Sequence, residues 1–172
     1  PLMVDCYMAL TVPYAIALAS ACKHLKIKWW EEVLQPDDQE GFRFLKQAHP
    51  GEIWTTGEHE YTRYGFRQLI HERCVDIVQP DVMSVGGLTE LLRISAMAAA
   101  YDVQLIPHAS GPYSYQFVAT QPNSPFSEYI STSADGLGVH PLFGELFLQE
   151  LLPSNGAITL DDKPGFGLEL NP

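Results

Sequence analysis

Two ionisable side chains, Asp81 and His108, stand in the same local setting one strand-and-helix unit apart. His108 follows the apolar run Val103–Ile106 and a proline, and Asp81 follows the apolar run Val75–Val78, a glutamine and a proline. Each pattern predicts a short buried strand that presents one side chain at its end. A carboxylate beside a histidine holds the imidazole in one tautomer and raises its basicity. We therefore predict a general base, His108, oriented by Asp81; the plainer interpretation of either motif alone is an ordinary strand cap.

Carboxylates follow three earlier strand-like runs, at Asp5, Glu31 and Glu58. Three like charges in one partly buried place repel one another unless they are protonated or neutralised. Mg²⁺ takes oxygen ligands in an octahedron and keeps positions open for water or substrate. We therefore predict that these residues bind Mg²⁺, although each alone would be an ordinary solvated acid. Glu32 competes with Glu31, and because neighbours on a strand point to opposite sides, only one can face the site. The prediction is Glu31.

The elements that position these residues alternate between strand and helix. Apolar strands alternating with helices predict a parallel sheet buried on both faces. The carboxyl ends of parallel strands meet on one face, and in a closed barrel they surround one cavity. The residues that follow the predicted strands lie 20 to 27 positions apart, about one βα unit, and are Asp5, Glu31, Glu58, Asp81, His108 and Glu128. This spacing predicts one shared site rather than unrelated caps.

Helical patterns fill the intervals between the strands. The predicted helices cover residues 11–25, 41–47, 61–72, 89–101 and 114–120. The sixth and last strand of the series is predicted at Pro125–Ser127. Beyond it the chain is polar and turn-rich, which indicates loops, with one small additional strand at Ala157–Leu160.

Composition limits the classes of protein. The chain has 172 residues, of which 46% are hydrophobic, so a domain with a substantial core is expected. The net charge of −11 argues against binding to nucleic acid or to an anionic membrane surface, and no apolar run is long enough to span a bilayer. Cys6, Cys22 and Cys74 are odd in number and lack metal-ligand spacing. They predict reduced thiols in a cytoplasmic protein.

The motifs as a set resemble one family. They are Trp30-Glu31-Glu32, Gly57-Glu58-His59, Gln79-Pro-Asp81-Val, Pro107-His108, Phe126-Ser-Glu128 and the tail Lys163-Pro-Gly-Phe-Gly-Leu-Glu-Leu170. This set is similar to the barrel of the enolase superfamily, in its mandelate-racemase-type branch, and most similar to the acid-sugar dehydratases there. The sequence departs from the family pattern at Val33, where related sequences often have proline, so the loop after that strand is expected to differ.

The resemblance implies an α/β fold: the C-terminal part, about six βα units, of a TIM-like (β/α)7β barrel. Residues 1–130 would supply barrel strands three to eight with their helices, and residues 131–172 a C-terminal strap that packs on the barrel and the cap. The first two strands and the capping domain have no counterpart in this chain. An open arc of strands exposes its edges, so residues 1–172 alone are expected to aggregate. The full-length form is expected to be a homo-oligomer.

The resemblance also implies a reaction and a partner. The substrate would be a small-molecule acid sugar, a six-carbon aldonic acid, with Mg²⁺ as the cofactor. His108 would remove the proton next to the carboxylate to give an enediolate, and the 3-hydroxyl would then leave, which yields a 2-keto-3-deoxy acid. Glu128 would hydrogen-bond a substrate carboxylate oxygen. His59 would either contact the substrate or brace the site.

Other functions stay open at this stage. Another aldonate dehydratase, or a racemase or epimerase of the same superfamily, would share these motifs, and the second base of a racemase would lie on a strand that this chain lacks. A fragment that binds without catalysis is the alternative of a different class. Lys26 and Lys28 begin a strand and are expected on the surface away from the site. Ser110 follows the predicted base without any triad spacing, so a hydrolase is disfavoured.

Overall fold

One parallel sheet organises the chain, and the computed structural model describes all 172 residues. The sheet has five strands in the order β1-β2-β3-β4-β5, and every neighbouring pair is parallel. The strands are β1 (Val4–Asp5), β2 (Trp30–Glu31), β3 (Trp54–Thr56), β4 (Ile77–Val78) and β5 (Gln104–Leu105). The predicted α/β class with a parallel sheet is confirmed.

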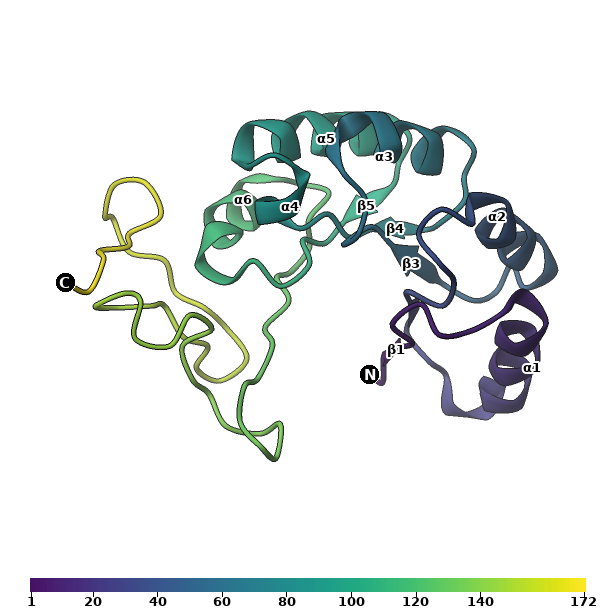
Figure 1. Cartoon of the computed structure of the whole chain (residues 1–172), viewed down its shortest axis with the longest axis horizontal. Helices are drawn as coiled ribbons and strands as arrows, with labels where there is room; N and C mark the ends of the chain where they lie inside the picture. The colour runs from purple at the N-terminus through teal and green to yellow at the C-terminus, as the bar shows by residue number, and fades with distance from the viewer.

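A helical crossover links each strand to the next, as parallel pairing requires. Figure 1 shows the helices along the outer side of an arc, with the strands on its inner side. The helices are α1 (Val12–Cys22), the 3₁₀ turn η1 (Lys23–Leu25), α2 (Gln39–Ala48), α3 (Thr62–His71), α4 (Val82–Val85), α5 (Leu88–Ala100), η2 (Gly111–Tyr113) and α6 (Tyr115–Thr120). None of them combines the length and the apolar composition that crossing a membrane requires.

The two faces of the sheet have separate cores. Trp30 stacks on Trp54 in a cluster of 22 buried residues. A smaller cluster of Trp29, Ile77 and Ile106, joined by Phe126, covers the other face. Because side chains alternate along a strand, residues two positions after this smaller cluster point to the same side. The second face is therefore the one that leads to the candidate site.

Two of the seven predicted strands are absent, the sixth of the series and the additional one, so the chain has five strands. Residues Pro125–Ser127 run beside the sheet, where Phe126 stacks on Trp29 with ring centroids 5.7 Å apart, but they form no ladder. Pro125 has no N–H to donate to a ladder, which explains part of this difference. Ala157–Leu160 is likewise not a strand, since only one isolated bridge, Ser154 to Ala157, forms there.

The C-terminal segment, residues 131–172, contains no helix and no strand of the sheet. Aromatic edge-to-face contacts attach it to η2, because Tyr113 lies 5.5 Å from Phe143, 6.2 Å from Phe147 and 5.2 Å from Phe166, measured between ring centroids. Such pairs add to stability beyond the area they bury. These contacts anchor the segment next to the loop that follows His108. Its packing on a cap domain stays a prediction.

Candidate active site at the strand ends

Asp81 and His108 lie side by side at the ends of β4 and β5. They form a parallel bridge, and the backbone N–H of His108 donates to the Pro80 carbonyl over 3.1 Å. The imidazole Nδ1 is 3.1 Å from Asp81 Oδ2. Asp81 Oδ1 accepts from the N–H groups of Met83 and Ser84, so the same carboxylate caps α4. With Nδ1–H donating to Asp81, Nε2 is the nitrogen left free to take a proton.

The charges around this pair set its basicity. Burial alone would lower the pKa of His108, but the hydrogen bond with Asp81 and the charges of Glu58 and other carboxylates outweigh it and raise the pKa to about 9. Burial would raise the pKa of Asp81, yet the hydrogen bonds from His108 and from two backbone N–H groups hold it below its usual value. The pair is therefore an ion pair at neutral pH in the absence of a cation.

Stability should fall with rising pH because of His108. A group whose pKa is raised on folding stabilises the protein fully below its unfolded pKa, here 6.5, and this contribution is lost as the pH rises through about 9. The full effect of such a shift is about 3 kcal/mol. We expect the metal-free protein to lose more stability between pH 6.5 and 9 than the His108→Asn variant, as measured by urea unfolding. Parallel pH curves for the two proteins would contradict this.

Glu31 and Glu32 are both buried but have different partners. Glu31 accepts from Trp29 Nε1 over 3.0 Å and from Gln79 Nε2 over 2.8 Å. Burial and the charges of nearby carboxylates raise the pKa of Glu31 to about 7, against these two hydrogen bonds. Glu32 accepts from the Thr56 hydroxyl and from the Gly57 N–H. Glu31 therefore shares the sheet face that Trp29 occupies, whereas Glu32 braces the end of β3.

Glu58 and His59 connect these carboxylates to the histidine pair. Glu58 Oε2 is 3.5 Å from His108 Nε2, and its Oε1 is 3.5 Å from His59 Nδ1. His59 Nδ1 is also 3.2 Å from Glu32 Oε2. Burial raises the pKa of Glu58, although the neighbouring histidines oppose the shift. The Nε2 of His108, which is the ring nitrogen that does not face Asp81, thus points toward Glu58.

Asp5 and Glu128 complete the group at its two ends. Asp5 pairs in register with Glu31 across β1 and β2, but it is exposed and its Oδ1 accepts from the Tyr7 N–H over 2.9 Å. Glu128 Oε2 accepts from the Ala109 N–H over 2.6 Å, next to His108. Both charges act on Glu31 and help to raise its pKa. All six predicted strand-end residues therefore lie at one end of the sheet, and His108 is in side-chain contact with two of them, Glu58 and Asp81.

The chemistry of the predicted metal ligands suits a hard cation. Asp5, Glu31 and Glu58 offer only carboxylate oxygens, and no lysine or arginine forms an ion pair with any of them. No three of the His, Cys, Asp and Glu side chains stand close enough together to hold an ion as they are oriented. The reason is visible in their contacts, since the oxygens of Glu31 face Trp29 and Gln79. The donor chemistry suits Mg²⁺, and the binding of the ion by these three residues stays a prediction.

Two residues of the site had no role in the sequence prediction. Gln79 donates to Glu31 and keeps a buried, unpaired Oε1, and Trp29 donates to Glu31 through its Nε1. The alternation of side chains along a strand could have predicted both residues, since residues two positions apart share a face. Trp29 lies two positions before Glu31, and Gln79 lies two positions before Asp81. Both residues orient Glu31 through their hydrogen bonds.

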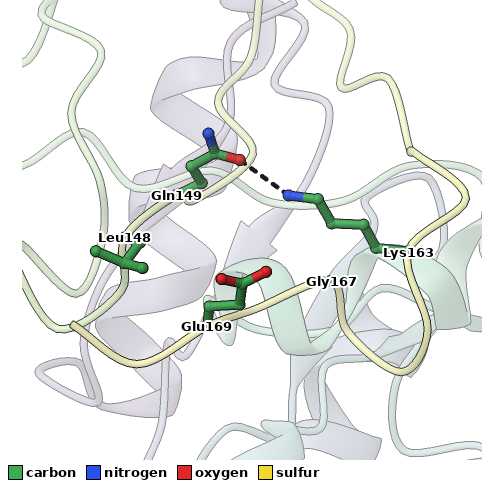
Figure 2. Close-up of a pocket in the computed structure, with 5 residues that line it drawn as sticks. All are labelled: Leu148, Gln149, Lys163, Gly167 and Glu169. Carbon is green, nitrogen blue, oxygen red and sulfur yellow. Dashed lines mark hydrogen bonds between the residues drawn. The ribbon is translucent and has the colours of Figure 1, made fainter. Parts of the chain in front are cut away.

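A separate pocket lies in the C-terminal segment. Figure 2 shows its lining residues, which are Leu148, Gln149, Lys163, Gly167 and Glu169. The pocket has a volume of about 410 Å³. The Lys163 Nζ donates to Gln149 Oε1 over 2.9 Å. None of the six strand-end residues lines this pocket, so it is distinct from the candidate active site.

Comparison with known proteins gives a consistent set of matches. The family model described as enolase C-terminal domain-like matches residues 1–172. L-rhamnonate dehydratase of Saccharopolyspora erythraea is 48% identical over 99% of this chain and 44% of its own length. The crystal structure of rhamnonate dehydratase from Gibberella zeae complexed with Mg has a TM-score of 0.96 and 60% identity, over 100% of this chain and 43% of that one. The 3,6-anhydro-D-galactonate cycloisomerase of Zobellia galactanivorans is 31% identical, with a TM-score of 0.84, over 99% of this chain and 48% of that one. The chain thus spans less than half the length of each of these relatives.

Proposed function

Because the chain belongs to the enolase C-terminal domain-like family, we propose that the complete protein is a Mg²⁺-dependent hydro-lyase that dehydrates a sugar acid to a 2-keto-3-deoxy acid. The observation that carries this proposal is the His108 imidazole, held by Asp81 at Nδ1 with Nε2 directed toward the carboxylates. We propose L-rhamnonate as the substrate. Two relatives at 48% and 60% identity act as L-rhamnonate dehydratases, which supports that choice.

His108 performs the proton transfers in this proposal, and Asp81 supports it. Nε2 of His108 removes the proton on the carbon next to the substrate carboxylate, while Asp81 holds the imidazole and stabilises the imidazolium. The resulting enediolate expels the 3-hydroxyl, which takes the proton from Nε2 and leaves as water. The enol then tautomerises to the 2-keto acid. Glu128 donates a hydrogen bond from its protonated carboxyl to a carboxylate oxygen of the substrate during the first step, and His59 contacts the substrate.

Asp5, Glu31 and Glu58 would hold the metal ion in this proposal. Mg²⁺ bound there would stabilise the negative charge that collects on the substrate carboxylate as the α-proton leaves. The raised pKa values of Glu31 and Glu58 support this assignment, since buried like charges need a counter-ion. Glu31 is preferred over Glu32 because it shares the sheet face of Trp29 and Ile106, which leads to His108, and because it pairs in register with Asp5.

A different reaction on the same site is the second candidate. The cycloisomerase relative shows that a chain with 31% identity and the same fold is associated with another acid-sugar reaction. Another aldonate dehydratase, or a racemase or epimerase, would use the same His108 and the same metal ligands. A protein that binds without catalysis is the remaining alternative.

One screen separates these functions. The complete protein, supplied with Mg²⁺, is incubated with a panel of aldonic and aldaric acids, and the product is measured as 2-keto-3-deoxy acid. We expect the highest kcat/KM with L-rhamnonate. A change of optical rotation without keto acid would instead indicate a racemase or epimerase. No turnover on any acid, in protein shown to bind Mg²⁺, would overturn the proposal of an enzyme.

A further inference from the structure

The hydroxyl of Ser110 joins the two strand ends that carry Asp81 and His108. Its Oγ donates to the carbonyl oxygen of His108 over 2.8 Å and accepts from the N–H of Val82 over 2.9 Å. Val82 follows Asp81 directly and is the first residue of α4. A single hydroxyl therefore contacts the backbone on both sides of the Asp81–His108 pair.

The N-terminus of α4 depends on this contact. The first N–H groups of a helix have no acceptor within the helix. Asp81 Oδ1 accepts from Met83 and Ser84, and Ser110 accepts from Val82. This division leaves Asp81 Oδ2 free for His108 Nδ1. Without the Ser110 hydroxyl, the N–H of the buried Val82 would lose its acceptor, which native structures rarely tolerate, and the turn that carries Asp81 would have to shift.

The backbone after His108 adopts a conformation that places this hydroxyl. Ala109, Ser110 and Gly111 all have positive φ, at 36°, 32° and 46°. Left-handed backbone is unfavourable for residues other than glycine and persists where the surroundings hold it in place. In this turn the Ala109 N–H meets Glu128, and the Ser110 side chain returns to the His108 carbonyl. The strained turn therefore contacts Glu128 and His108 directly, and it contacts the segment that carries Asp81 through the N–H of Val82.

We propose that Ser110 is a positioning residue that holds Asp81 and His108 in register for proton transfer. This inference rests on the proposed function. Ser110 does not act as a nucleophile, because it is 0% exposed and its hydrogen bonds go to the backbone on both sides. Its effect on the reaction passes through the distance and the angle between the carboxylate and the imidazole.

The decisive substitution is Ser110→Ala in the complete protein. We expect kcat to fall by about 10- to 100-fold, since misplacing a catalytic group by about 1 Å has effects of that size. KM should change by less than about threefold, because no side chain that touches the substrate is altered. The kcat is therefore calculated per folded molecule, because a role limited to stability would lower the amount of folded enzyme and leave the kcat of each folded molecule unchanged.

Ser114→Ala is the matched control. Ser114 is 1% exposed, and its hydroxyl donates to the Gly111 carbonyl over 2.9 Å, in the same loop. It has no hydrogen bond to residues 81, 82 or 108. Its loss removes an equivalent buried hydrogen bond without touching the pair, so we expect kcat within about twofold of the wild type.

Ser110→Gly keeps the test decisive if the alanine variant does not fold. Glycine accepts the left-handed backbone without strain but lacks the hydroxyl, so the fold should persist while kcat falls as in Ser110→Ala. A crystal structure of the metal-free variant gives a readout independent of turnover. We expect the distance from His108 Nδ1 to Asp81 Oδ2 to exceed the 3.1 Å of the wild type.

The outcomes separate this inference from the proposed function. A wild-type protein without activity on any sugar acid would overturn the proposed function, and the Nδ1–Oδ2 distance in the variants would still decide whether Ser110 positions the pair. An active wild type together with Ser110 variants that keep both its kcat and its Nδ1–Oδ2 distance would overturn the inference. A selective loss of kcat in both Ser110 variants, with Ser114→Ala unaffected, would support it.

Discussion

Replacing His108 by asparagine is expected to abolish both product formation and the exchange of the substrate α-proton with solvent deuterium. Asparagine keeps a polar side chain that can still face Asp81, but it cannot take a proton. Loss of a general base costs about 10²–10⁴-fold in rate, which corresponds to about 3–5 kcal/mol of transition-state stabilisation. Both readouts should fall together, because in this proposal one nitrogen, Nε2, serves both proton transfers.

The exchange measurement makes the prediction specific to His108 as the base. If a different residue removed the α-proton, the variant would still exchange deuterium while dehydration slowed. His71→Asn is a suitable control, because His71 is exposed at the C-terminal end of α3, where its Nδ1 contacts the Tyr101 hydroxyl and none of the strand-end residues. It should retain wild-type rates. Normal turnover in the His108 variant would refute the assignment.

Sequence periodicity predicted the sheet well, and the reason lies in particular residues. Trp29 and Glu31, like Ile106 and His108, are two positions apart and therefore share a face of the sheet. The same alternation sends Trp30 into the opposite core. The order of apolar runs and helices was thus enough to predict parallel pairing and the convergence of the strand ends.

The sequence could not show which predicted strands form ladders. Phe126 is half-buried and stacks on Trp29 as a strand residue would, but Pro125 cannot donate, and packing alone does not create a ladder. The prediction of a strand at Ala157–Leu160 was wrong, because an apolar composition does not by itself provide a neighbouring strand with which the backbone can pair. Strand pairing depends on distant segments, which local patterns do not record.

The roles of Glu32 and Ser110 were also beyond local patterns. The positive φ of Glu32, 45°, turns its carboxylate toward Thr56 and Gly57, and nothing in the sequence around Glu32 signals such a conformation. The left-handed turn at Ala109 and Ser110 is equally unsignalled, because neither residue favours it. In both places contacts with other βα units hold the backbone, and such contacts become visible only in the folded chain.

The adjacent acids Glu31 and Glu32 offer the sharpest test of the metal site. Glu31→Gln removes a carboxylate that is predicted to bind Mg²⁺, while the amide keeps nearly the same size and retains an acceptor for Trp29 or Gln79. We expect Mg²⁺ affinity, measured by titration calorimetry on chelator-treated protein, to fall by at least about 10- to 100-fold, the range found for residues that merely support a ligand. Turnover at low Mg²⁺ should fall with it and partly recover at high Mg²⁺.

Glu32→Gln is the matched comparison, with the same chemical change one residue away. Its oxygens already accept from Thr56 and Gly57 and face His59, so its loss should disturb the end of β3 while leaving Mg²⁺ affinity within about threefold of the wild type, as expected of a residue that does not bind the ion. If Glu32→Gln lost Mg²⁺ binding and Glu31→Gln kept it, the ligand would be Glu32. The raised pKa of Glu31 would then reflect only its burial and its repulsion by the charges of Glu128 and Asp5. Binding of the ion by Glu32 would require the backbone at Glu32 to leave its left-handed conformation.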